Sequence, residues 1–170
     1  MPDLNSFSSG QLGADRPVHQ VAVPIRDHDV GLPLGLNYLD IDSRTNLRVK
    51  AYADKPVGPS AIIRIATWAD TILYSGGCTW FEVGKNDRDF QYGVVSAPRL
   101  EPSKEIFYEE ISFEKAFAEP PKIVCWLNMF NIDSKSNCRI YTGTKNITKT
   151  GFTIYIAACS DTIVHAASTT

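Results

Sequence analysis

The sequence predicts an all-β chain made of two tandem small antiparallel β-sandwich domains with six strands each. Two observations predict this fold. A stretch that begins at Leu39 recurs from Phe130 onward at an offset of 91 residues, which indicates a repeated structural unit. Short segments alternate between apolar and polar residues, whereas no segment of ten or more residues has the 3.6-residue period of a helix. Short strands in close succession are typical of β-sandwiches.

The repeat sets the domain boundaries. Residues 39–79 align without a gap onto residues 130–170, and identical residues occur in both turns and strands. The identical pairs include Asp42 and Asp133, Asn46 and Asn137, Arg48 and Arg139, Ile63 and Ile154, Ile65 and Ile156, and Asp70 and Asp161. We therefore expect a first domain at residues 1–85 (repeat one), a connector at 86–98 and a second domain at 99–170 (repeat two). The second copy stops one residue before the equivalent of Trp80, so either the natural sequence ends there or further sequence follows.

In repeat one, strands are expected at residues 18–25, 32–39, 46–53, 61–68 and 71–83. The segment 46–53 alternates most clearly, because Arg48, Lys50 and Tyr52 lie between apolar residues. The same alternation places Trp68 on the outward face of its strand. Residues 1–17 are polar and are expected to form a loop-like arm without a strand, and residues 26–31 are expected to form a turn.

In repeat two, strands are expected at residues 106–117, 122–130, 137–143, 152–159 and 162–168. Residues 90–102 contain two prolines and are expected to serve as the arm of this repeat, as residues 1–17 do for repeat one. A domain this small buries only a modest core. Association between the repeats, or between chains in a homo-oligomer, is therefore expected.

The composition excludes several classes of protein. The formal net charge is −2 and the basic residues are scattered, which argues against a nucleic-acid binder. No apolar run approaches the ~18–20 residues of a membrane span. The N-terminus lacks a charged start followed by an apolar core, so we expect a cytoplasmic protein or one released without a classical signal peptide. An extracellular location stays open if a leader was removed.

Neither a cofactor nor a metal ion is expected. The cysteines do not align with one another under the repeat, so free thiols are expected rather than a shared disulfide framework. They are Cys78, Cys125, Cys138 and Cys159. No CxxC motif or pair of histidines indicates zinc, and the sequence has neither a Gly-rich phosphate loop nor a nucleophile-elbow serine.

Three outward side chains of repeat one, Arg48, Trp68 and Tyr74, are the candidates for binding chemistry. A bare outward Trp is costly, since soluble proteins rarely expose large apolar patches without a reason. One interpretation is that Trp68 is buried against the arm or a neighbouring chain. The other is a sugar site, in which the aromatic ring stacks on the apolar face of a pyranose and Arg48 donates hydrogen bonds to its hydroxyls.

The motifs that contain these residues resemble the H-type lectin domain, the fold of snail agglutinin and of discoidin C-terminal domains. In repeat one they are Asn46-Leu47-Arg48-Val49, Thr67-Trp68-Ala69-Asp70-Thr71-Ile72-Leu73-Tyr74 and a closing Trp80. In repeat two they are Pro120-Pro121-Lys122-Ile123-Val124, Asn137-Cys138-Arg139-Ile140 and Ser160-Asp161-Thr162. Tandem copies of this kind are similar to fungal proteins that carry several such modules.

The resemblance implies a non-enzymatic lectin that forms trimers and binds glycans of the galactose and N-acetylgalactosamine type near subunit boundaries. By motif position it implies carbohydrate-binding residues in both repeats, namely Arg48, Trp68, Ala69, Tyr74, Arg139, Ser160 and His165. Because Cys159 replaces the Trp in repeat two, repeat one is expected to be the active copy. The family's Gly-x-Asp of the N-terminal arm has no counterpart here, since counting back reaches Ser9-Gly10-Gln11 without the acid.

Two other functions stay open. The chain could be an oligomerisation or protein-interaction module in which the same faces are subunit contacts and the sugar site is vestigial. A glycoside hydrolase would need a pair of acids. The close pairs Asp40 with Asp42 and Asp87 with Asp89 fit ordinary turn chemistry better.

Overall fold

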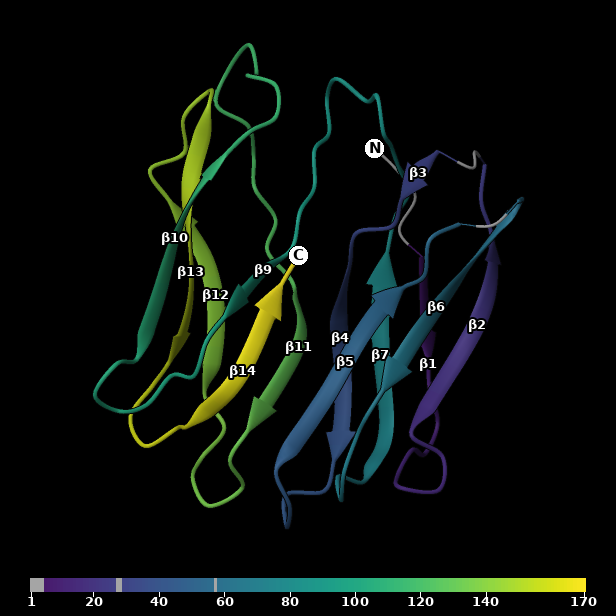
Figure 1. Cartoon of the computed structure of the whole chain (residues 1–170), viewed down its shortest axis with the longest axis vertical. Coiled ribbons are helices and arrows are strands. Elements are labelled where there is room, and N and C mark those ends of the chain that lie inside the picture. The colour runs from purple at the N-terminus through teal and green to yellow at the C-terminus, as the bar shows by residue number, and fades with distance from the viewer. Residues whose placement is uncertain (1–4, 27–28, 57) are drawn as a thin grey trace.

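The computed structural model describes residues 5–26, 29–56 and 58–170, and every helix or strand in that part of the chain is a β-strand (Figure 1). The prediction of an all-β antiparallel fold is therefore confirmed. In chain order the strands are β1 (Asn5–Ser8), β2 (Val18–Pro24), β3 (Val30–Gly31), β4 (Leu34–Ile41), β5 (Leu47–Ala53), β6 (Ser60–Ala66), β7 (Leu73–Trp80), β8 (Val83–Gly84), β9 (Val95–Ala97), β10 (Ile106–Ser112), β11 (Leu127–Ile132), β12 (Ile140–Lys145), β13 (Gly151–Ala158) and β14 (Val164–Thr169). Within these residues no helix is long and apolar enough to cross a membrane.

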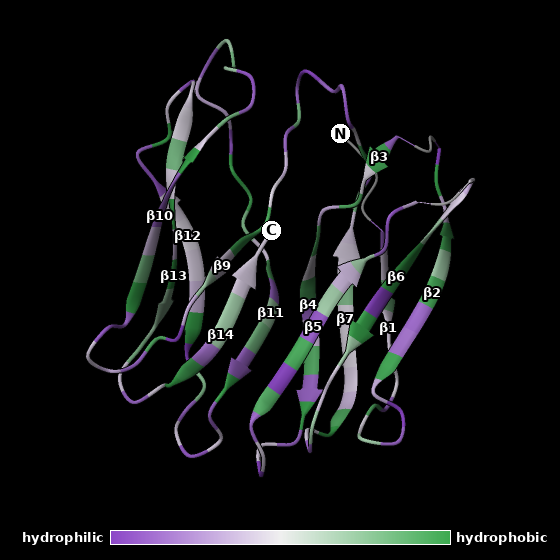
Figure 2. Cartoon of the chain, in the orientation of Figure 1, coloured by the Kyte–Doolittle hydropathy of each residue, from purple (hydrophilic) through white to green (hydrophobic). Residues whose placement is uncertain are grey.

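Repeat one forms two layers of three strands. One layer has the order β1-β7-β4, and the other has the order β2-β6-β5. The alternation in β5 sets its orientation, because Val49 and Ala51 are buried whereas Lys50 is exposed. Figure 2 shows this alternation as successive hydrophobic and hydrophilic bands along β5. The short β3–β8 ladder lies outside these two layers.

Repeat two has the same strand order. A shift of 91 residues moves β1, β7 and β4 approximately onto β9, β14 and β11, which pair in that order. The same shift moves β2, β6 and β5 approximately onto β10, β13 and β12, which also pair in that order. Ile154 and Ile156 are buried in β13 as Ile63 and Ile65 are in β6. The repeated inward residues therefore form equivalent parts of the core.

The two repeats share one sheet. β5 of repeat one pairs with β11 of repeat two, which gives a six-stranded sheet with the order β2-β6-β5-β11-β14-β9. Figure 1 shows β5 and β11 facing each other at the centre of the molecule. The alternation of a strand reports which face is buried, not which neighbour completes its edge. The pairing of β5 with β11 across the repeat boundary is therefore seen only in the tertiary structure.

Packing at the boundary adds to this strand pairing. The backbone of Gly35 in β4 lies against Trp126, so closely that a Cβ atom at Gly35 would come within 2.0 Å of the Trp126 Cβ. The Trp126 ring also makes an edge contact with Phe81, with 5.9 Å between the ring centroids. One hydrophobic cluster runs through both repeats and includes Ile65, Phe130 and many other buried residues. The core is thus continuous across the chain.

The prediction of a strandless arm was wrong. Asn5–Ser8 pairs with β7 as β1, and Leu12 forms a further bridge to Leu73. The arm is polar because only its inner face is covered: Leu12 is buried and Phe7 packs on the core. Its counterpart β9 lies inside the predicted 86–98 connector and pairs with β14. The expectation that residues 90–102 play the role of the arm agrees with this pairing.

Other strand boundaries also differ from the predictions. The predicted strand at 122–130 begins only at Leu127, and the one at 106–117 ends at Ser112. The predicted strand at 71–83 begins at Leu73 and ends at Trp80. The predicted turn at 26–31 contains β3, while residues 27 and 28 lie outside the described part of the chain. The end of a strand depends on where its pairing with the neighbouring strand stops, so the local alternation of residues predicts strand ends inaccurately.

All four cysteines are free, as predicted. Cys78 in β7 is buried, and this burial raises the pKa of its thiol to about 12. Cys138 is exposed and lies in the segment between β11 and β12.

Candidate functional site

The turn between β6 and β7 carries the predicted Trp68 and Ala69. Ala69 has a φ of 56°, in the left-handed region that residues with a Cβ seldom adopt. The Trp68 carbonyl accepts a hydrogen bond from the backbone N–H of Thr71 at 3.4 Å, which closes the turn. The Trp68 ring is exposed. The turn therefore presents a large aromatic side chain to solvent at the end of β6.

Arg48 in β5 is fixed beside this turn. Its Nη1 donates to the Asp70 carboxylate at 2.5 Å and to the Thr71 hydroxyl at 3.1 Å. Thr71 is fully buried and donates its own hydroxyl to the Asn46 carbonyl at 2.5 Å. The Thr67 hydroxyl donates to the Arg48 carbonyl at 2.7 Å, which ties β5 to the start of the turn. The guanidinium is thus held in place by groups that flank Trp68.

Tyr74 in β7 is anchored by an acid from the end of β4. Its hydroxyl donates to Oδ2 of Asp42 at 2.9 Å, while its ring stays exposed. Asp42 also accepts hydrogen bonds from the Arg44 backbone N–H and from the Arg44 guanidinium. The bond from the Arg44 side chain is the main reason that the pKa of Asp42 lies well below its usual range. The bond to Asp42 in turn raises the pKa of Tyr74.

Repeat two keeps most of this arrangement. Arg139 donates to Asp161 at 2.8 Å, and the Thr162 hydroxyl donates to the Asn137 carbonyl at 2.5 Å. Ser160 has a φ of 61°, so the turn geometry of Ala69 is also kept. The large difference is the aromatic residue, because the position of Trp68 is held here by Cys159.

A second acid anchors the remaining predicted residue of repeat two. Nε2 of His165 lies 3.5 Å from Asp133, in the way that Tyr74 reaches Asp42 in repeat one. A backbone hydrogen bond from Lys135 is the main cause of the lowered pKa of Asp133. The structure thus brings Arg139, Ser160 and His165 into positions equivalent to those of Arg48, Ala69 and Tyr74.

The repeat-one site lies at the boundary between the repeats. Asn131 of β11 is directly opposite Arg48 in the β5–β11 ladder, so the two side chains lie on the same face. The Oδ1 atom of Asn131 is buried and has no hydrogen-bond partner. Oδ1 of Asn46 accepts from the backbone N–H of Ser134 at 3.1 Å. Repeat two therefore forms one wall of the repeat-one site.

The repeat-two site has no such wall. β12 pairs with β13 alone among the described strands, so the edge beside Arg139 is open. The Arg139 side chain is 47% exposed, whereas that of Arg48 is 16% exposed. Two sites with nearly the same internal bonds therefore differ in solvation because only one of them has a neighbouring strand.

Sequence reasoning missed several residues of these sites. Asp42, Asp70 and Thr71 recur in both copies, so the repeat itself contained a signal that could have identified them. Asn131 and Ser134 act from the other repeat. Only the pairing of β5 with β11 brings them to Arg48 and Asn46, and no local pattern records that pairing.

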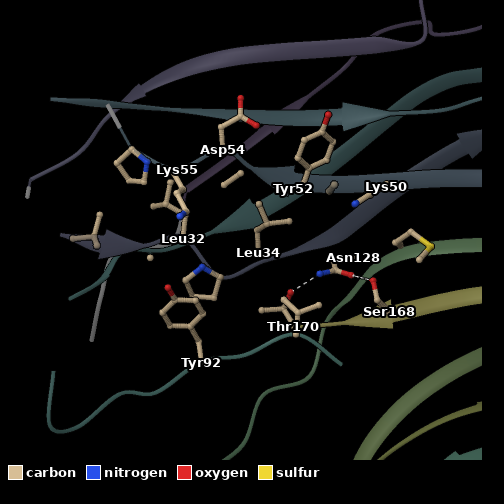
Figure 3. Close-up of a pocket in the computed structure, with 18 of the residues that line it drawn as sticks. Leu32, Leu34, Lys50, Tyr52, Asp54, Lys55, Tyr92, Asn128, Ser168 and Thr170 are labelled. Atoms are coloured by element: carbon tan, nitrogen blue, oxygen red, sulfur yellow. Dashed lines mark hydrogen bonds between the residues drawn. The ribbon is translucent and has the colours of Figure 1, made fainter. Parts of the chain in front are cut away.

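A separate cavity of about 430 Å³ lies at the repeat boundary (Figure 3). Its lining combines apolar side chains such as Leu32 and Leu34 with polar ones such as Tyr52 and Asn128. Asn128 is held by hydrogen bonds with Ser168 and Thr170. None of the seven predicted carbohydrate-binding residues lines this cavity. Among the described residues, no group of three or more His, Cys, Asp or Glu side chains could hold a metal ion.

Comparison with known protein families gives one match. Residues 109–170 match the family model of the H-type lectin domain. The match covers just over a third of the chain, and it begins within β10 and ends with the chain in repeat two. No curated protein and no solved structure matches the chain. The segment from β10 onward is thus similar to an H-type lectin domain.

Proposed function

We propose that this protein is a non-enzymatic carbohydrate-binding protein and that both repeats are modules of the H-type lectin kind. The observation that carries the proposal is the group formed by Arg48, Trp68 and Tyr74. Each of the three comes from a different strand or turn, and each is either exposed or aimed by a buried partner. The family match to residues 109–170 supports the same function.

The geometry suits a sugar ring. The exposed ring of Trp68 offers a face for the apolar side of a pyranose, and such contacts are favourable by about 1 kcal/mol. Arg48 has donors beyond the Nη1 that binds Asp70 and Thr71, and these can reach sugar hydroxyls. The Asp70 carboxylate is largely exposed and can accept from a hydroxyl. Donor, acceptor and platform therefore lie together.

We further propose galactose-type or N-acetylgalactosamine-type glycans as ligands and a trimer as the favoured oligomer, on the basis of the family resemblance. Repeat one is proposed as the stronger site, because repeat two has Cys159 where repeat one has Trp68. A single lectin site is weak, and a millimolar dissociation constant corresponds to only ~4 kcal/mol. Several sites on one assembly would increase the avidity for a multivalent glycan.

Calorimetric titration with N-acetylgalactosamine, together with a glycan array, tests the proposal. We expect Trp68→Ala and Arg48→Ala each to weaken binding by roughly tenfold or more, because each removes a direct contact. Phe90→Ala is the matched control, since it also removes an exposed aromatic ring but lies in the connector. Binding to no glycan, or binding unchanged by both site variants, would contradict the proposal.

The alternative is an assembly module whose sugar site is vestigial. The absence of an acid in the Ser9-Gly10-Gln11 segment and the replacement of Trp68 by Cys159 in repeat two favour it. Light scattering on Trp68→Ala separates the two functions. Loss of the oligomer in a protein that binds no glycan supports the alternative, whereas an intact oligomer with reduced glycan binding supports the lectin.

A further inference from the structure

The cavity at the repeat boundary begins where β5 and β11 stop pairing. Their ladder ends with Lys50 opposite Met129. β5 continues to Ala53, and there it pairs with β6 alone among the described strands. The cavity of about 430 Å³ lies at this end of the ladder and is lined by residues of both repeats and of the connector. It is therefore a product of the tandem arrangement and is not a feature of either repeat alone.

The size and the lining of the cavity suit a small ligand with an apolar body. Sites for small molecules have volumes of roughly 300–1,000 Å³ and mainly apolar linings with a few polar groups. Leu32, Pro33 and Leu34 line the cavity and are buried. Tyr92 and Val94 of the connector also line it, and they are 52% and 60% exposed. Exposed apolar side chains that gather around a hollow are a feature of binding sites.

Close packing on a glycine holds Tyr92 in place. The Tyr92 hydroxyl lies so close to Gly31 that a Cβ atom at Gly31 would come within 1.8 Å of it. Gly31 belongs to β3, which pairs with β8 of repeat one. A side chain of the connector is thus fixed against repeat one, while about half of its surface stays exposed. A positioned aromatic ring is a ready contact for a second aromatic ring.

The charged side chains of the lining favour an anion. Lys55 is exposed, and among the described residues no carboxylate pairs with its ammonium group. Lys50 adds a second positive charge, with its Nζ 5.1 Å from the centroid of the Tyr52 ring. The acid Asp54 also lines the cavity, but its Oδ2 accepts hydrogen bonds from the Arg64 guanidinium at 2.8 and 3.0 Å. Because Arg64 compensates that acid, the two lysines dominate the charge of the lining.

The two ends of the cavity differ in chemistry. Figure 3 shows Lys55 and Tyr92 at one end and Asn128, Ser168 and Thr170 at the other. At the second end, the Asn128 amide donates to the Thr170 hydroxyl at 2.7 Å and accepts from the Ser168 hydroxyl. These polar groups satisfy one another. The anionic group of a ligand is therefore expected at the end that holds Lys55.

We propose that the cavity between the repeats binds a small aromatic carboxylate, whose ring packs against Tyr92 and Leu34 and whose carboxylate pairs with Lys55. The apolar part of the lining favours the ring, because burial of apolar surface is favourable. The ammonium group favours the carboxylate through a charge-assisted hydrogen bond. None of the seven predicted carbohydrate-binding residues lines the cavity. The site is therefore separate from the proposed glycan sites and does not rest on the proposed function.

Calorimetric titration of the full chain with 2-naphthoate, and with the neutral 2-naphthamide of nearly the same shape, tests the charge preference. We expect the carboxylate to bind saturably and about fivefold more tightly than the amide, which is the contribution of an ion pair close to solvent. Lys55→Gln should remove this preference and leave binding of 2-naphthamide unchanged. Lys122→Gln, at an exposed lysine that does not line the cavity, is the matched control and should change neither affinity.

The aromatic contact has a test of its own. Tyr92→Ala should weaken both probes by roughly fivefold to tenfold, because it removes the ring against which they pack. Phe90→Ala should weaken neither, since Phe90 is an exposed aromatic residue of the same connector that does not line the cavity. In amide NMR spectra, 2-naphthoate should shift the signals of Gly31 and Ser96 and leave that of Trp68 in place.

Three results would overturn the proposal. The first is a wild-type chain that shows no saturable binding of 2-naphthoate. The second is an affinity that neither Lys55→Gln nor Tyr92→Ala changes. The third is a set of NMR shifts centred on Trp68 and Arg48, which would place the probe in the candidate sugar site. Loss of glycan binding in Trp68→Ala has no bearing on these results, so this proposal and the lectin proposal can fail separately.

Discussion

At the residue scale, two hydrogen-bonded acids organise each candidate site. Asp70 holds the guanidinium of Arg48, and Asp42 holds the hydroxyl of Tyr74. In repeat two, Asp161 accepts a hydrogen bond from Arg139 in the same way, and Asp133 lies 3.5 Å from Nε2 of His165. The acids position side chains that were predicted to bind sugar, so they are expected to matter for binding even where they do not touch it.

Asp42→Asn should destabilise the fold in a pH-dependent way. The pKa of Asp42 in the folded chain is lowered by Arg44, below the value of about 4 of an unfolded aspartate. The stabilisation is therefore fully present above pH ~4 and is lost as the pH falls toward the lower folded-state pKa. Urea unfolding should show a loss of stability in Asp42→Asn that is constant from pH 7 to about 5 and shrinks on further acidification.

The exposed Asp89 provides the control for this measurement. Asp89→Asn should leave the unfolding midpoint unchanged across the same pH range, because no cationic side chain among the described residues pairs with its carboxylate. A loss of stability in Asp42→Asn that grows as the pH falls would contradict the assignment of the lowered pKa.

At the scale of elements, the two repeats share equivalent side-chain hydrogen bonds as well as the same strand order. Asn37 of β4 donates to Thr79 at 2.6 Å, and Asn128 of β11 donates to Thr170 at 2.7 Å. The central strands β6 and β13 bury equivalent isoleucines. The outward faces of the two repeats differ far more, since Arg64 pairs with Asp54 in repeat one at a position where repeat two has Tyr155.

Truncation of a buried side chain in β13, the central strand of repeat two, should lower the stability of the fold. Ile156 in β13 is fully buried in the shared core. We expect Ile156→Ala to lower the free energy of unfolding by about 2–5 kcal/mol, through lost apolar burial and the cavity left behind. Ile147→Ala, at a surface position, should cost far less. Equal losses in the two variants would show that β13 is not a central element of the core.

At the scale of the whole molecule, the two repeats are joined by a shared sheet and a shared core and are not independent domains connected by a linker. The six-stranded sheet and the hydrophobic cluster both cross the repeat boundary. A boundary of this kind couples the unfolding of the two halves. Calorimetry of the wild-type chain should therefore show a single transition.

Gly35→Ala should weaken the repeat boundary. The added Cβ would lie 2.0 Å from the Trp126 Cβ, so β4 and Trp126 must move apart. Overpacking of this kind costs about 1–3 kcal/mol, and we expect a lowered melting temperature in calorimetry. Gly84→Ala is the matched control, because nothing lies within 4 Å of its added Cβ. A Gly35→Ala chain as stable as the control would contradict the close packing at this boundary.

The sequence by itself determined the all-β fold, most strand positions and the residues that recur in the two candidate sites. It could do so because a two-residue alternation reports which face of a strand is buried, and the repeat reports which residues serve the same role twice. Alternation identified Arg48 and Trp68 as outward residues, Tyr74 was a further outward candidate, and Ala69 came only from the resemblance to the H-type lectin domain. The acids Asp42 and Asp70 could have been identified from the repeat, since they recur as Asp133 and Asp161.

Only the tertiary structure decided which edges meet. The pairing of β5 with β11 brings Asn131 beside Arg48, closes the repeat-one site and leaves the edge beside Arg139 open. Backbone hydrogen bonds across an edge depend on residues about 80 positions apart, and any strand with the right alternation could supply them. The difference between a closed site in repeat one and an open one in repeat two is therefore a property of strand pairing, not of the motif.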